Sequence, residues 1–114
     1  MSFIGNEEVD KIVSVLLDKH GEDLVVIDLA AKSFLADFFV IATANSDVHK
    51  DTLVDYTKET LDDMGISYKT EGESSSNWVL IDAGFVVVHI FSKEGRDFYR
   101  LENLWSDSPI HHIS

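Results

Sequence analysis

The stretch Asn77 to Trp105, NWVLIDAGFVVVHIFSKEGRDFYRLENLW, decides the fold of this chain. Within it, Trp78 to Asp82 and Phe85 to Ile90 are rich in the β-branched and aromatic residues that strands prefer. Between these two segments stand turn residues, and Gly84 takes a positive φ at little cost. The stretch therefore predicts a β-hairpin at the centre of the fold.

The two faces of this hairpin differ in composition. With a two-residue loop at Ala83 and Gly84, Trp78 lies opposite His89, and the side chains alternate between faces. One face is then aliphatic and predicts core: Val79, Ile81, Val86, Val88 and Ile90. The other combines apolar and polar groups: Trp78, Leu80, Asp82, Phe85, Val87, His89 and Phe91. This second face either packs under the C-terminal helix or is presented to a partner, and a three-residue loop would change the pairing.

Working outward from the hairpin, hydrophobic periodicity and turn residues predict the remaining elements. We expect helices at about 7–20, at 47–64 and from the cap Ser92 to Trp105. Further strands are expected at 24–29, 37–44 and 66–70, with a connection at 30–36 and a loop at 71–76. In the last helix, Phe98, Leu101 and Leu104 or Trp105 line one side. The order α-β-β-α-β-β-β-α predicts an α+β fold whose five-stranded sheet is mixed and mainly antiparallel.

Length and composition restrict the class of protein. The 114 residues suit one domain, 1–114, and 45% of them are hydrophobic, which is enough for a core. We expect the tail from about residue 107 to fray. No apolar run reaches the roughly 18–20 residues that span a bilayer, and the start MSFIGNEEVDK resembles neither a signal nor a transit peptide. With no cysteine in the chain, the expected location is the cytoplasm.

The charge of the chain bears on its partners. Nine Lys and Arg residues stand against 21 Asp and Glu residues, for a net charge of −12, and the cations are spread along the sequence. Phosphate backbones repel such a chain, so we expect no direct binding to nucleic acid. A basic protein partner suits the charge, although acidity can also serve solubility alone.

Motifs of catalysis and cofactor binding are missing from the sequence. It contains no Walker loop, G-x-G-x-x-G, G-x-S-x-G or H-E-x-x-H pattern, and its histidines lack ligand spacing, so we expect neither cofactor nor metal. His89, inside VVVHIF, is either a general base or a histidine whose ring nitrogens are satisfied by neighbours. With these motifs missing, binding through a surface is the remaining class of function. Trp, Tyr and Arg dominate protein interfaces, so one hypothesis is that the sheet face with Trp78, Leu80 and Asp82 contacts a partner.

Three ordered blocks resemble the ribosomal silencing factor family, also called the Iojap family. They are DFFVIATANS before a helix, then NWVLIDAGFVVVHIF, then RDFYRLENLW, and the match covers Leu24 to Trp105. Two positions depart from the family pattern: Val48 precedes His49 where members often have Arg, and the second strand begins with Asp37-Phe38-Phe39-Val40 where they often have D-Y-F-V.

The resemblance implies a fold similar to that of nucleotidyltransferases without their catalytic signature, and a role that is not enzymatic. Family members bind a basic ribosomal protein, number fourteen of the large subunit, on the subunit-joining face. They thereby block association with the small subunit and repress translation, and they form homodimers when free. Carried over by position, the resemblance implies partner contacts at Trp78, Leu80, Asp82, His89, Arg96 and Tyr99.

Two alternatives remain from other classes. The first is a homodimerising module that uses the same Trp78 surface and has no affinity for the ribosome. The second is a cryptic nucleotidyltransferase or hydrolase, which requires two or three carboxylates that converge on a metal ion.

Overall fold

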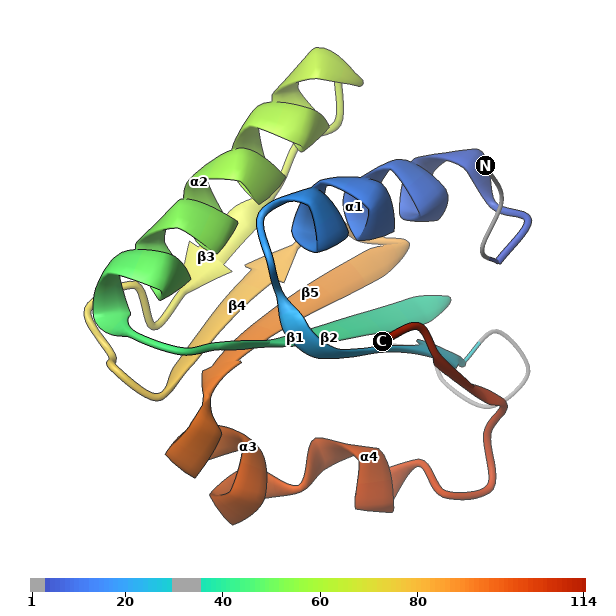
Figure 1. Ribbon diagram of the computed structural model, residues 1–114. Coiled ribbons are helices and arrows are strands. Elements are labelled where there is room, and N and C mark those ends of the chain that lie inside the picture. Colours follow the sequence, from blue (N-terminus) through green and yellow to red (C-terminus); the bar gives the residue numbers. More distant parts are fainter. Residues whose placement is uncertain (1–3, 30–35) are drawn as a thin grey trace.

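In the computed structural model, which describes residues 4–29 and 36–114, a six-stranded sheet lies between two layers of helices (Figure 1). The elements, in chain order, are α1 (Glu7–Asp18), β1 (Glu22–Asp28), β2 (Phe38–Ala44), α2 (Asp47–Asp63), β3 (Lys69–Glu71), β4 (Trp78–Asp82), β5 (Val86–Ser92), α3 (Lys93–Tyr99), α4 (Leu101–Leu104) and β6 (Ile110–His112). The strand order is β3-β4-β5-β2-β1-β6, and every neighbouring pair is antiparallel except β2 and β5. The predicted mixed, mainly antiparallel sheet is therefore confirmed.

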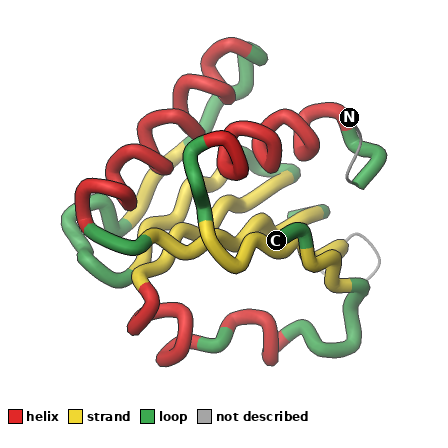
Figure 2. The backbone as a smooth tube through the Cα atoms, viewed as in Figure 1, coloured by secondary structure: helices red, strands yellow, loops and turns green. Residues whose placement is uncertain are grey.

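Helices α1 and α2 cover one face of the sheet (Figure 2). Each begins at a capping side chain: Asn6 accepts a hydrogen bond from the Val9 amide at 3.1 Å, and Ser46 accepts one from the His49 amide at 3.0 Å. Their apolar sides pack against the aliphatic hairpin face that alternation predicted, and all five of its side chains are buried: Val79, Ile81, Val86, Val88 and Ile90. This layer forms the larger of the two hydrophobic cores.

The hairpin has its predicted faces but not its predicted register. Its two-residue loop is Gly84-Phe85, since the Ala83 amide donates to the Val86 carbonyl at 2.9 Å and Gly84 has a φ of +88°. Trp78 therefore lies opposite Phe91, and not opposite His89. The pairing is displaced by two residues, and an even displacement leaves each side chain on its face. Phe85 is the exception, because in the turn it packs against the α1 and α2 core instead of the second face.

The predicted helix from Ser92 to Trp105 is two helices, and the break at Arg100 was not foreseen. Arg100 has a φ of +45°, a left-handed conformation that costs a non-glycine residue about 1–2 kcal/mol. The break lets Leu101 be buried against the second face of the sheet and brings the Glu102 carboxylate to 3.1 Å from Arg96 Nε. Burial and ion pairing offset the backbone strain.

The tail that we expected to fray forms β6, which makes six strands and not five. Ile110, His111 and His112 pair with Ile27, Val26 and Val25 of β1. Without β6, this side of β1 would be an open edge whose backbone groups have no partner. The predicted connection at 30–36 lies, apart from Ala36, outside the described residues. None of the helices in the described ranges is both long and apolar enough to cross a bilayer.

Candidate protein-docking face

The second sheet face is covered only in part. Helix α3 packs against β5 and β2, and Val87 and Phe91 of this face are buried in a cluster with Leu101 of α4, as the first alternative for this face predicted. Farther out on β4, Trp78 and Leu80 are half-buried and Asp82 is exposed. We call these three residues the β4 strip. Lys69 and Glu71 of β3 pair with Asp82 and Leu80, so they lie on the same face, and both are exposed.

A chain of aromatic contacts links the strip to the core. The rings of Phe39 and His89 are 4.6 Å apart, Trp78 lies 5.8 Å from His89, Tyr99 lies 4.6 Å from Trp78, and Phe98 lies 5.0 Å from Tyr99. Exposure rises along this chain, from buried Phe39 and His89 to 43% for Tyr99 and 80% for Phe98. The ring of Tyr99 is therefore held against Trp78 before a partner binds, which lowers the entropy lost on binding.

His89 lies inside the fold, behind Trp78. It is 3% exposed, and its Nδ1 accepts a hydrogen bond from Trp78 Nε1 at 3.1 Å. Burial lowers the pKa of His89 to about 3, so its ring is neutral at physiological pH. Nε2 is buried without a hydrogen-bond partner. In this conformation His89 fixes the indole of Trp78 and has no exposed surface to give to a partner.

Arg96 is also directed into the fold. Its side chain is 10% exposed, its Nε donates to Glu102 Oε2 at 3.1 Å, and its Nη1 donates to Thr43 Oγ1 at 2.9 Å. These bonds join α3, α4 and β2, so Arg96 sets where the two short helices lie. Among the six residues expected to contact a partner, the structure thus brings Trp78, Leu80, Asp82 and Tyr99 to one partly open surface and directs His89 and Arg96 inward.

Asp82 is held in a defined orientation. Its Oδ1 accepts a hydrogen bond from the Gly84 amide at 2.8 Å, an Asx turn that closes the hairpin. Asp82 is exposed, and Lys69 is the residue opposite it on β3. Asp82 can therefore accept a hydrogen bond from a basic side chain of a partner without reorganising.

Sequence reasoning missed two exposed apolar residues. Phe98, and Leu104 as an alternative to Trp105, were expected to line one side of a continuous helix, but they are 80% and 74% exposed. The break at Arg100 changes the phase of the helical pattern, and of that predicted side Leu101 is buried and Trp105 is half-buried. The sequence signal for them was composition: two large apolar residues in a stretch that already contained Tyr99 and Trp105.

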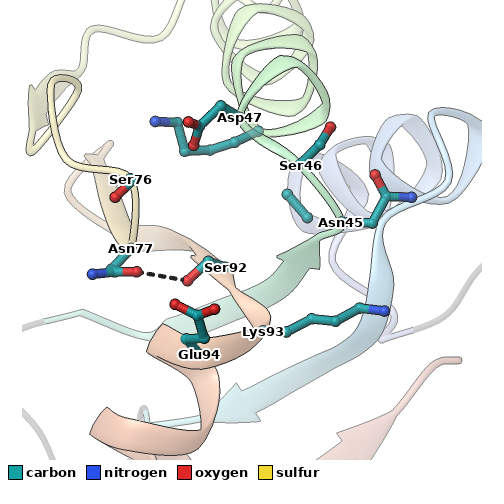
Figure 3. A pocket seen from close by; sticks show the side chains of 10 residues that line it. Asn45, Ser46, Asp47, Ser76, Asn77, Ser92, Lys93 and Glu94 are labelled. Atoms are coloured by element: carbon teal, nitrogen blue, oxygen red, sulfur yellow. Dashed lines mark hydrogen bonds between the residues drawn. The ribbon is translucent and has the colours of Figure 1, made fainter.

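A second feature is a polar hollow of about 330 Å³ at the carboxyl ends of the parallel strands β2 and β5 (Figure 3). Asp47 and Glu94 line it together with Lys50 and Lys93. Both ammonium groups have partners already: Lys50 donates to the Ser75 carbonyl at 2.6 Å, and Lys93 lies 3.5 Å from Glu22. The residues described in the structure contain no cluster of three or more His, Asp or Glu side chains that could hold a metal ion.

Comparisons with known proteins agree on one family. A family model described as "Ribosomal silencing factor during starvation" matches residues 5–114. The chain is 42% identical to the ribosomal silencing factor RsfS of Bacillus subtilis over 82% of this chain and 80% of that protein, and 38% identical to that of Halalkalibacterium halodurans over 93% and 92%. A crystal structure of protein CV0518 from Chromobacterium violaceum has a TM-score of 0.84 and 31% identity, and it covers 93% of this chain and 88% of that one.

Proposed function

Because the chain belongs to the ribosomal silencing factor family, we propose that it binds the large ribosomal subunit through the β4 strip and Tyr99 and thereby prevents the small subunit from joining. The contact on the ribosome is a basic protein of the subunit-joining face, protein fourteen of the large subunit. The protein acts in the cytoplasm as a repressor of translation, by occupancy and without a chemical step.

The observation that supports this proposal is the uncovered part of the second sheet face. On this face the half-buried Trp78 and Leu80 lie on the same strand as the exposed carboxylate of Asp82, and the ring of Tyr99 packs on Trp78. This combination of apolar, aromatic and charged groups is typical of a protein interface. The net charge of −12 favours a basic polypeptide over ribosomal RNA, since RNA phosphates repel an acidic surface.

Each residue of the face has a distinct role in this proposal. Trp78 and Leu80 supply apolar area, and Tyr99 supplies a half-exposed ring with a hydroxyl. Asp82 accepts hydrogen bonds from Lys or Arg of the partner. His89 and Arg96 position these groups, His89 through its bond to Trp78 and Arg96 through α3 and α4.

A subunit-joining experiment tests the function. Isolated large and small subunits are mixed with and without the protein, and the joined fraction is measured on a sucrose gradient. We expect the protein to reduce the joined fraction and to migrate with free large subunits. An unchanged joined fraction at saturating protein would refute the proposal. The resemblance also implies a homodimer in the free state, and sedimentation without ribosomes tests for it.

A further inference from the structure

Next to the β4 strip lies a recess that none of the roles above uses. It has a volume of about 300 Å³ and is lined by Asn77, Glu94, Gly95, Phe98 and Tyr99. Tyr99 belongs both to this recess and to the proposed docking face, because its ring packs on Trp78 at 4.6 Å. We propose that this recess receives a Lys or Arg side chain of the basic ribosomal partner, an inference that rests on the function proposed above.

Gly95, which lines the recess, allows α3 to lie close to the start of β4. A Cβ on this residue would lie 2.3 Å from the Asn77 carbonyl oxygen, so no larger residue fits where α3 passes the start of β4. Gly95 is buried, while Phe98 and Tyr99 beside it are exposed. The recess is thus a hollow next to two rings that meet edge to face at 5.0 Å, with an interplanar angle of 85°. Such rings bind the alkyl stem of a long basic side chain and attract its cation.

Glu94 is the acidic residue that lines the recess, and it also lines the polar hollow of Figure 3. Its carboxylate is exposed, and no cation in residues 4–29 or 36–114 forms an ion pair with it. The neighbouring Lys93 is directed to Glu22 instead. An unpaired carboxylate at the edge of an aromatic hollow is complementary to an ammonium or guanidinium group, and a guanidinium can also donate to the Asn77 side chain.

Charge also favours one of the two possible occupants of this recess. A second copy of the chain would bring another net charge of −12 against an acidic recess, and repulsion opposes that contact. A basic ribosomal protein removes the repulsion and supplies the cation. Phe98, 80% exposed and held by Tyr99, then packs against the same partner side chain as an aromatic anchor.

The test measures binding to isolated large ribosomal subunits by co-sedimentation, with four variants of the full chain. Glu94→Gln removes the charge, Phe98→Ala removes the outer ring, and Leu80→Glu disrupts the β4 strip. Glu59→Gln, at an exposed position of α2, is the matched control. Circular dichroism verifies that each variant is folded, which the exposure of Glu94 and Phe98 favours.

We expect Glu94→Gln to weaken binding about fivefold at low salt, with a smaller difference at high salt, because salt screens an exposed pair. Phe98→Ala should weaken binding roughly tenfold, and Glu59→Gln should leave it unchanged. Wild-type affinity in Glu94→Gln and Phe98→Ala together with a loss in Leu80→Glu would overturn this inference and leave the proposed function intact. A Phe98→Ala protein that loses self-association but binds the subunit normally would show that the occupant is a second copy. No binding by the wild-type protein would overturn both proposals.

Discussion

Replacement of His89 by leucine should make the stability of this protein less sensitive to acid. The free energy of unfolding that the protein loses between about pH 7.5 and about pH 5 should be smaller by about 2 kcal/mol. In the folded chain, burial lowers the pKa of His89 to about 3, whereas an unfolded chain restores it to about 6.5. At a pH below the pKa of His89 in the unfolded chain, the unfolded state binds a proton at this residue and the folded state does not. Stability is therefore complete above about pH 6.5 and is lost progressively as the pH falls toward 3.

The magnitude follows from the difference between the two pKa values. Between about pH 7.5 and about pH 5, linkage predicts a loss of about 2 kcal/mol from this one residue. The side chain is 3% exposed, so solvent screening does not reduce the effect appreciably. Protonation would also break the bond in which Nδ1 accepts from Trp78 Nε1.

Urea unfolding at the two pH values measures the effect. The free energy of unfolding of the wild-type protein should fall by about 2 kcal/mol more than that of His89→Leu over this interval. Val48→Ala, at an exposed position of α2, removes no titratable group and is the control, which should retain the wild-type pH dependence. Identical pH dependence in wild type and His89→Leu would show that His89 titrates normally and is not sealed inside the fold.

Two further predictions concern stability. Arg96→Ala should destabilise the protein by about 2–3 kcal/mol in urea unfolding, since it leaves Glu102 and Thr43 without their partner, whereas Lys11→Ala, which breaks an exposed pair with Glu7, should cost less than about 0.5 kcal/mol. A small effect of Arg96→Ala on stability with a large one on ribosome binding would instead place Arg96 at the rim of the interface. Deletion of residues 110–114 should lower the free energy of unfolding by roughly 2–4 kcal/mol, because it exposes the backbone edge of β1 and the buried side chains of Val25 and Ile27. Unchanged stability after the deletion would mean that β6 contributes no pairing.

The sequence predicted those parts of the fold that local periodicity determines. Alternation placed Val79 and Ile81 on the core face and Trp78 and Leu80 on the other, and this result survived an error of two residues in the register. Strand β6 has only three residues, two of them histidine, so no apolar pattern marks it. Its partner is β1, far away in the chain, and such long-range pairing leaves no local signal.

The candidate site was predictable to the extent that its residues share one strand. Trp78, Leu80 and Asp82 alternate along β4, so their common face follows from spacing. The inward positions of His89 and Arg96 depend on tertiary contacts with Trp78, Thr43 and Glu102, which spacing cannot show. Likewise, the left-handed conformation of Arg100 carries no residue-type signal, and it places Phe98 and Leu104 in two separate helices, where both are exposed.

One measurement tests most directly whether the uncovered sheet face is what binds the ribosome. Wild type, Leu80→Glu and Val48→Glu are each sedimented with isolated large subunits. Leu80 lies on the β4 strip, whereas Val48 is a 77% exposed apolar residue of α2, on the opposite side of the sheet, so the same change is made at both sites. We predict that wild type and Val48→Glu pellet with the subunit and that folded Leu80→Glu remains in the supernatant. Equal pelleting of all three proteins would contradict the assignment of the docking face to β4.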